Sequence, residues 1–376
     1  MITEPLMSRD HLEIRDVVHD FVEAQFTSER VRADAANPYD ELAWKQMVEL
    51  GWSGLGISSD NGGAALGSYV QCIVHRELGA RLAPSPYLSS AAFSVAALNL
   101  LAAPDTAGPL LSGLANGMIS GCVVLGHGQG WPTDNASIVA TRQVDDGWEL
   151  TGDTTLTLDA AGAEALFVVA LIDGTTDWGL FQIDGRNEEI CPGAVTTVDR
   201  TRTFGDLHFD ATPAIPLHEV SFGADRVASL VDQMAVFLSA EMVGAAKACM
   251  EQTLEYLKTR HQFGKPIGSF QALKHRCADL AVGVTIAQEL VFSAAETVDG
   301  NDAAALALVA PLALARCGEV LKKVTEEAIQ LHGGVGFTDE IDIGLYYKRA
   351  ISDLELIATP IEARARLNEV RHGCSE

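Results

Sequence analysis

The order of the hydrophobic patterns along the chain restricts its fold more than any other feature. From Ser8 to about Leu114 the spacing is helical, and the first helix carries its apolar face on Leu12, Val17, Val18, Phe21 and Val22. Between about Ala115 and Ala224 the pattern changes to short β-branched runs separated by turn residues. From Asp225 onward, long helical patterns return. Helices and strands therefore occur in blocks.

This block order predicts an α+β fold and argues against a doubly wound parallel sheet, which needs alternating helices and strands. We expect an N-terminal helical domain (residues 1–114), a central β domain (115–224) and a C-terminal helical bundle (225–376). Residues 144–148, with the sequence Val-Asp-Asp-Gly-Trp, are predicted to form a hairpin tip in the β domain. The uncharged stretch 82–104 is predicted to form a buried, alanine-rich helix.

Charge and cysteine content restrict the partners and the compartment. The 376 residues include 51 acidic and 26 basic side chains, a formal charge of -25. Such a surface repels phosphate backbones and anionic lipid, so we expect neither nucleic acid nor membrane as a partner. The seven cysteines include no CxxC pair, and the N-terminal residues show no apolar signal region. We therefore expect a cytoplasmic protein with reduced thiols.

Most sequence signatures of catalysis are missing. The chain has no HExxH, GxxxxGK[ST] or GxSxG motif and no Cys/His spacing typical of a metal site. Gly126, Gly128 and Gly130 follow a strand-like run, but strand and turn residues come next instead of a helix that could bind a pyrophosphate. We interpret these glycines as a plain turn.

Two segments are more specific. In Arg260–Leu280, a predicted helix ends at an arginine, a Gly-Lys-Pro turn follows, and a new helix begins near Ser269. In Ile329–Phe337, a helix breaks at paired glycines, where free backbone N–H groups permit the close approach of a ligand. Together with ELAWKQMVELGWSGLGIS, DNGGAALGSY and HRELGARLAPSPY, these segments resemble the acyl-CoA dehydrogenase family along the whole chain.

The resemblance implies a helical domain, a β domain and a C-terminal four-helix bundle, assembled as a dimer of dimers. It also implies FAD as cofactor, with the isoalloxazine ring held by one subunit's β domain and the ADP half held by the neighbour's bundle. Residues of this chain that match the ADP-side motif are Arg260 for pyrophosphate, Phe263 beside adenine and ribose, Gln271 and Gln330 for ribityl or pyrophosphate oxygens, and Gly333 and Gly334 for backbone approach. The alternative is that Arg260 only caps one helix and the glycines only end another. The presence of both motifs in family order favours the cofactor interpretation.

The ring half of the family site differs in this chain. Residues 125–132 stand where the family has Thr-Glu-Pro and Gly-Ser-Asp, and residues 152–158 lack the tryptophan of the family's Lys-x-Trp-Ile-Thr strand. The family's catalytic base aligns with Ile357, and its alternative base position aligns with Met234. Glu355 could replace it only if the alignment slips, and for Glu241 a polar helix-packing role is favoured. No catalytic residue is therefore assigned.

The chain keeps the ADP-side motif but lacks the ring contacts and the base. In this it resembles the subunit without the catalytic Glu in actinobacterial α2β2 acyl-CoA dehydrogenases that degrade steroid side chains. The resemblance implies α,β-dehydrogenation of an acyl-CoA, with the base on a second acyl-CoA dehydrogenase subunit and an electron-transfer flavoprotein as electron acceptor. Two alternatives stay open. One is a flavin monooxygenase on the same fold, which would still need ring contacts, and the other is a non-catalytic scaffold subunit.

Overall fold

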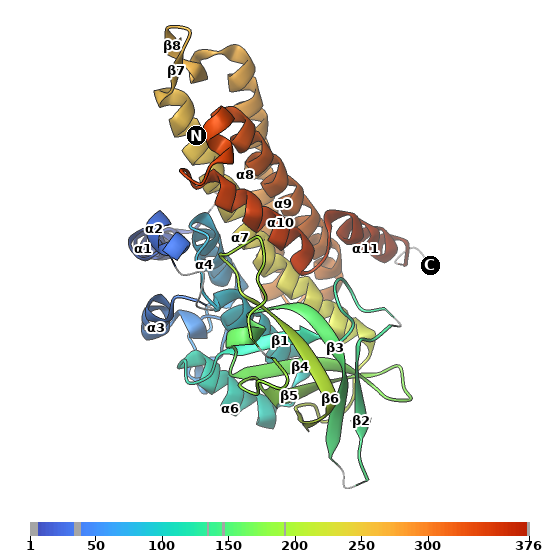
Figure 1. Cartoon of the computed structure of the whole chain (residues 1–376). Coiled ribbons are helices and arrows are strands. Elements are labelled where there is room, and N and C mark those ends of the chain that lie inside the picture. Colours follow the sequence, from blue (N-terminus) through green and yellow to red (C-terminus); the bar gives the residue numbers. More distant parts are fainter. Residues whose placement is uncertain (1–6, 34–38, 134, 145–146, 192, 374–376) are drawn as a thin grey trace.

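The computed structural model describes residues 7–33, 39–133, 135–144, 147–191 and 193–373 (Figure 1). A helical region comes first, with a central sheet and a long helical bundle after it, so the predicted mixed fold is confirmed. The domain boundaries stay predictions. The first region contains α1 (Arg9–Gln25), α2 (Ser28–Ala33), α3 (Glu41–Glu49), α4 (Gly67–Ala80), the π-helix η3 (Tyr87–Ser94), α5 (Val95–Leu101) and α6 (Pro104–Ala115).

Within this region, the predictions for the alanine-rich stretch and for the apolar face of α1 are only partly correct. The alanine-rich stretch is buried, as expected, but its first part is the π-helix η3 rather than an α-helix. On α1, Val18 and Val22 are buried whereas Val17 is 59% exposed, so its placement on the apolar face is wrong. Val17 and Val18 are neighbours 100° apart on a helix, so a narrow buried stripe takes only one of them.

The central sheet closes on itself. Its strands are β1 (Gly121–Leu125), β2 (Ile138–Arg142), β3 (Trp148–Leu158), β4 (Ala165–Ile172), β5 (Trp178–Asp184) and β6 (Phe204–Pro216). Their order is β1-β4-β2-β3-β6-β5, and β5 pairs with β4 as well. β2 and β3 form the predicted antiparallel hairpin, whose tip residues Asp145 and Asp146 lie outside the described residues. Closure leaves an interior filled by apolar side chains such as Phe181 and Phe209.

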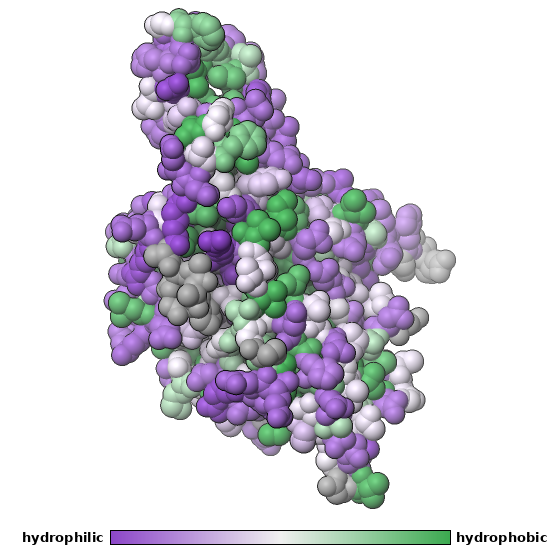
Figure 2. Space-filling view, viewed as in Figure 1, coloured by the Kyte–Doolittle hydropathy of each residue, from purple (hydrophilic) through white to green (hydrophobic). Residues whose placement is uncertain are grey.

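The C-terminal region is a helical bundle built around α7 (Ala224–Thr259) and α9 (Ala303–His332). The short strands β7 (His261–Gln262) and β8 (Lys265–Pro266) form a hairpin before α8 (Gln271–Asp299), so α8 begins two residues later than predicted. The turn η6 (Gly333–Phe337), α10 (Ile343–Leu356) and α11 (Pro360–Gly373) complete the bundle. In Figure 1 the hairpin end of the bundle projects away from the β domain, and Figure 2 shows hydrophobic and hydrophilic residues side by side on the surface of this end.

Among the described residues, three helical segments are long and apolar enough to cross a membrane by length and composition: α7, α8 and Ala303–Phe337. The apolar window of α7 is 89% buried inside the protein, whereas those of α8 and of Ala303–Phe337 are only 50% and 56% buried. On α8 the exposed Val282 and Ile286 are one helical turn apart and share a face. A single chain therefore leaves part of the bundle's apolar surface uncovered.

The backbones of α4 and α7 pack unusually close to each other at two glycines. A Cβ atom on Gly79 would lie 2.2 Å from the backbone oxygen of Glu241, and one on Gly244 would lie 1.9 Å from that of Arg76. Only glycine permits these two backbones to approach so closely. This approach brings Glu241 of α7 beside His75 of α4.

Candidate functional site

The predicted ADP-side residues lie on the projecting end of the bundle. Arg260 is the C-cap of α7, and its exposed guanidinium has no hydrogen-bond or ion-pair partner among the described residues. Phe263 is 89% exposed at the hairpin tip, with a left-handed φ of 54°. Gln271 begins α8, Gln330 lies in the last turn of α9, and both are exposed.

The structure brings the two sequence motifs together. Leu257 of α7, Cys277 of α8 and Leu331 of α9 form a small apolar cluster. The Tyr256 ring stacks on His332 with ring centroids 4.3 Å apart, and the Tyr256 hydroxyl donates to the His332 backbone oxygen over 3.2 Å. The end of α7, the start of α8 and the end of α9 therefore form one surface.

The paired glycines are open to solvent at this end. Gly333 has φ 65° and ψ -141°, a conformation that side chains disfavour. No atom lies within 4 Å of the position that a Cβ would take on Gly333 or Gly334. A ligand could therefore contact this backbone directly. Gly333 N–H also caps α9 at the Gln330 oxygen, so the helix-ending role that we considered as an alternative is present too.

A cavity of about 530 Å³ lies between the β domain and the helices, far along α7 from Arg260. One part of its wall is apolar, formed by Phe93, Val123, Leu125, Met234 and Leu356. Another part carries the hydroxyl groups of Ser137, Thr154, Thr155 and Thr157. None of the described residues that line it is Lys, Arg or His, and its one carboxylate is Asp153.

Asp153 is a cavity residue that sequence reasoning missed. Its carboxylate is 72% exposed and lies 2.6 Å from His208 Nδ1, and this pairing raises the pKa of His208. In the sequence, Asp153 looks like an ordinary outward-facing strand residue, and only the pairing of β3 with β6 places His208 opposite it. The family resemblance had placed residues 152–158 in the ring half of the site, but no local signal showed that His208 lies opposite Asp153.

The loop after β1 is tied to the bundle at the cavity wall. Gly130 N–H donates to the Ile357 oxygen over 2.6 Å, and the Gln129 side chain donates to the Glu355 oxygen. The Trp131 indole N–H donates to Asp232 of α7 over 2.7 Å. The loop is thus a turn with two left-handed glycines, Gly128 and Gly130, as the sequence predicted.

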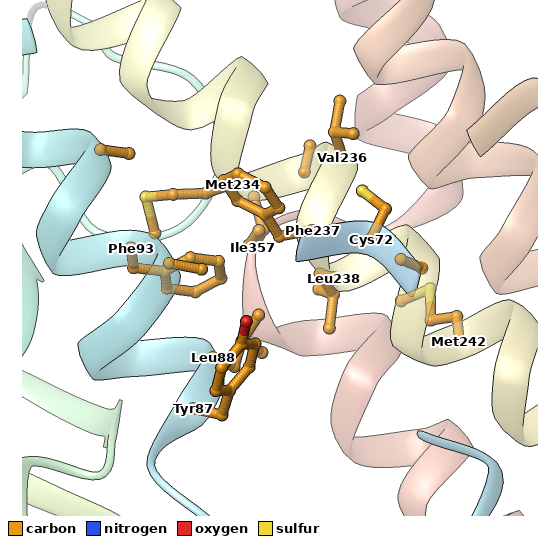
Figure 3. Close-up of a cluster of buried hydrophobic side chains, with 14 of the residues drawn as sticks. Cys72, Tyr87, Leu88, Phe93, Met234, Val236, Phe237, Leu238, Met242 and Ile357 are labelled. Atoms are coloured by element: carbon orange, nitrogen blue, oxygen red, sulfur yellow. The ribbon is translucent and has the colours of Figure 1, made fainter. Parts of the chain in front are cut away.

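Ile357 and Met234 are both buried apolar residues. They belong to one cluster of buried apolar side chains and are 1% and 4% exposed (Figure 3). Met234 comes from α7 and Ile357 from the end of α10, 123 positions later in the sequence. No described carboxylate lines the cavity from these two segments.

Two family comparisons match most of the chain. Residues 8–117 match the N-terminal domain of acyl-CoA dehydrogenases, and residues 223–353 match the C-terminal domain. Acyl-CoA dehydrogenase IpdE2 of Mycobacterium tuberculosis is 34% identical over 359 residues, which cover 94% of this chain and 95% of that protein. The chain belongs to the acyl-CoA dehydrogenase family.

Solved acyl-CoA dehydrogenases share the fold. Butyryl-CoA dehydrogenase from Megasphaera elsdenii superposes with a TM-score of 0.87 at 19% identity, over 98% of this chain and 100% of that one. A chain of the ChsE4-ChsE5 complex from Mycobacterium tuberculosis superposes with a TM-score of 0.85 at 22% identity, over 98% of both chains. At these identities the likeness is one of fold.

Acyl-CoA dehydrogenases are FAD-dependent flavoproteins, so the two ends of α7 can be tested against that cofactor. The bundle end fits an ADP group, because an unpaired guanidinium and open glycine backbone are groups that bind pyrophosphate. The cavity at the other end of α7 fits the isoalloxazine ring less well. It offers hydroxyl groups but no cationic side chain among its described lining residues, and Asp153 can only accept hydrogen bonds when ionised.

Glu241 and Glu355, the two carboxylates considered as substitutes for the base, are both poorly placed. Burial would raise the pKa of Glu241, but Arg202 and the hydrogen bond from His75 outweigh it and hold this pKa at about 2. A carboxylate with so low a pKa is a weak base. Glu355 is exposed, and its neighbour Leu356 faces the cavity instead.

Proposed function

We propose that this chain is the non-base subunit of an FAD-dependent acyl-CoA dehydrogenase and supplies the ADP-side contacts of a shared flavin site. One observation carries the proposal. The two positions at which the family places its base, Ile357 and Met234, are both apolar and buried. Neither side chain can take a proton from a substrate, so in the proposed enzyme the carboxylate comes from another subunit.

The distance along α7 supports a site shared between subunits. Met234 lines the cavity, and 26 residues further along the same helix Arg260 marks the other end. At 1.5 Å per residue the two are about 39 Å apart. This is longer than an extended FAD molecule, so one FAD cannot reach both ends of one chain.

In the proposed site the residues of this chain bind and orient. Arg260 would hold the pyrophosphate by charge-assisted hydrogen bonds, with Phe263 beside adenine and ribose. Gln271 and Gln330 would bond ribityl or pyrophosphate oxygens, and the Gly333–Gly334 backbone would approach the cofactor. When bound, FAD supplies hydride acceptance in α,β-dehydrogenation of an acyl-CoA. The partner's Glu would remove the α-proton.

The assembly we propose is an α2β2 heterotetramer with a second acyl-CoA dehydrogenase subunit. The ChsE4-ChsE5 structure is a complex of two differently named chains, and a second fold relative, Tcur3481-Tcur3483, is a steroid acyl-CoA dehydrogenase. The half-covered apolar faces of α8 and α9 provide surface for such contacts. We extend the proposal to a steroid side-chain substrate, an electron-transfer flavoprotein as acceptor and a cytoplasmic location.

The experiment is an activity assay with separated subunits. The chain alone should show no acyl-CoA-dependent reduction of a ferrocenium acceptor, and activity should appear when a second acyl-CoA dehydrogenase subunit that carries the base is co-expressed. Replacing the partner's base by Gln should abolish that activity, since general-base catalysis typically contributes about 10² to 10⁴ in rate. Turnover by this chain purified alone would refute the proposal.

A further inference from the structure

The β7–β8 hairpin, at the projecting end of the bundle in Figure 1, closes with a strained two-residue loop. Gln262 pairs with Lys265, so Phe263 and Gly264 form the loop. Both have positive φ, 54° and 77°, as in the type I′ turns of tight hairpins. Glycine adopts this conformation readily, but for a bulky residue such as Phe it is strained. The Phe263 side chain is 89% exposed, so burial of its ring does not offset that strain.

Two neighbouring side chains orient the Phe263 ring. It meets the Phe270 ring edge to face, with ring centroids 6.2 Å apart and an angle of 85° between the ring planes. The Lys265 ammonium group lies over the same Phe270 ring, 4.4 Å from its centroid. Aromatic pairs favour edge-to-face geometry, and the quadrupole of a ring attracts a cation over its face. Phe263, Phe270 and Lys265 therefore form one group of interacting side chains, the hairpin cluster.

Phe270 is the anchored member of the hairpin cluster, because it begins α8. It is the N-cap of that helix, and its backbone oxygen accepts the N–H groups of Leu273 and Lys274, each over 3.1 Å. Its own N–H donates to the Ile267 oxygen over 3.1 Å. At the base of the hairpin, the Ile267 N–H donates to the Arg260 oxygen over 2.8 Å. The Phe270 ring thus extends from a fixed backbone toward the exposed loop.

We propose that Phe270 and Lys265 are positioning residues that hold the exposed Phe263 ring ready to pack against the adenine of FAD. The inference rests on the proposed ADP-side role of this end of the bundle. A ring that is ordered before a ligand arrives loses less conformational entropy on binding, which raises affinity. Among the described residues Lys265 has no ion-pair partner, so the Phe270 ring is the contact that holds its ammonium group.

Hydrogen exchange tests the hairpin cluster without any flavin. In the full chain purified alone, Phe270→Leu removes the central ring and should speed exchange of the backbone amides of residues 261–267 by at least about threefold. Phe270→Tyr keeps a ring and should leave the exchange rates unchanged. Phe21→Leu is the matched control, because it removes another partly buried ring that meets an aromatic partner, Trp52, edge to face.

Circular dichroism shows whether each variant folds. If Phe270→Leu does not fold, Lys265→Met at an exposed position replaces it, with an expected increase in exchange rate of at least about twofold. A folded variant whose exchange rates rise by less than these factors would overturn the hairpin cluster as an ordering device.

Retention of FAD by the complex with the second subunit tests the role toward adenine. Phe270→Leu should weaken retention about threefold to tenfold, the range expected for an aromatic pair together with a cation–π contact, and Phe270→Tyr should restore it. Lys265→Met should weaken retention in the unmodified chain but have no further effect beside Phe270→Leu, because Lys265 acts through that ring.

The outcomes separate this inference from the proposed function. Faster hairpin exchange with unchanged FAD retention would overturn the role toward adenine. Additive losses from Lys265→Met and Phe270→Leu would overturn the positioning role of Lys265, since they would show that it contacts FAD itself. An unmodified complex that holds no FAD would contradict the proposed function, whereas hydrogen exchange would still decide whether the cluster orders the hairpin.

Discussion

Arg202 Nη2 lies 2.7 Å from Glu241 Oε2 in the interior, and this ion pair joins the loop before β6 to α7. Arg202 also donates to Asp353 of α10 over 2.8 Å, and His75 of α4 lies 3.2 Å from the other Glu241 oxygen. The cluster thus connects helices of both helical regions with the β domain. Because its charges are nearly inaccessible to water, removal of one partner leaves another charge buried without compensation.

Glu241→Gln should therefore affect stability before catalysis. We expect the free energy of unfolding, measured with urea, to fall by about 3 to 5 kcal/mol, as for other broken buried ion pairs. Turnover per folded complex, with the partner present, should stay within about tenfold of the unmodified complex. Glu251→Gln, on the exposed side of α7, is the control and should change stability by less than about 0.5 kcal/mol. Lost turnover with normal stability and flavin content would identify Glu241 as a base.

Glu355→Gln should have little effect on stability or on turnover. Its side chain is exposed, and the contact that the structure shows at this residue uses the backbone oxygen, which the substitution retains. We expect turnover with the partner within about tenfold of the unmodified complex. A rate loss of 10²-fold or more at full flavin occupancy would place the base in this chain.

Asp232 should make stability depend on pH. Burial raises its pKa from 3.8 to about 7, against the opposing hydrogen bond from Trp131. A raised pKa means that the protonated group stabilises the fold at low pH, and this contribution is lost as pH rises through about 7. Asp232→Asn removes the titration and keeps an oxygen that can accept the Trp131 N–H.

Urea unfolding of both proteins at pH 5 and pH 8 provides the measurement. Between these values the unmodified chain should lose up to about 3 kcal/mol relative to Asp232→Asn. If the difference between the two proteins is the same at both pH values, Asp232 does not titrate as the structure indicates.

The block order of helices and strands was visible in the sequence because each block repeats its own hydrophobic period. The π-helix at Tyr87–Ser94 was not, since its hydrogen-bond register has no distinct residue pattern and depends on packing. Ser94, for instance, donates its hydroxyl to the Ser89 oxygen five residues earlier.

In the candidate site, too, some features are marked by local sequence patterns and others depend on packing between distant segments. The bundle-end residues are marked by local motifs, so the sequence alone was enough to predict them as a site. The cavity depends on segments that are distant in the sequence: Gly130 bonds to Ile357, and Phe93 and Met234 line the same wall. Nothing local in the sequence reports that Arg202 meets Glu241 or that Asp153 pairs with His208.

Arg260→Ala should weaken flavin retention without unfolding the chain. The guanidinium is exposed and has no partner among the residues that the structure describes, so its loss removes no internal contact. Charge-assisted hydrogen bonds contribute about 1.5 to 3 kcal/mol each, which predicts a roughly tenfold to hundredfold weaker retention of FAD by the complex. Arg260→Lys should restore only part of it, because a lysine lacks the planar fork of donors.

Dialysis followed by flavin absorbance measures the effect. Lys258→Ala, an exposed cation two residues earlier that pairs with Glu255, is the matched control and should keep its flavin. Full occupancy of Arg260→Ala after extensive dialysis would show that this motif does not bind the pyrophosphate.

Flavin content per chain tests the shared site most directly. The chain should be purified alone and, separately, co-expressed with its partner, and the flavin of each preparation should be counted against protein after dialysis. Our account predicts little FAD on the isolated chain and about one FAD per heterodimer in the complex, two per α2β2 assembly. A homotetramer of this chain that retains one FAD per subunit would contradict it.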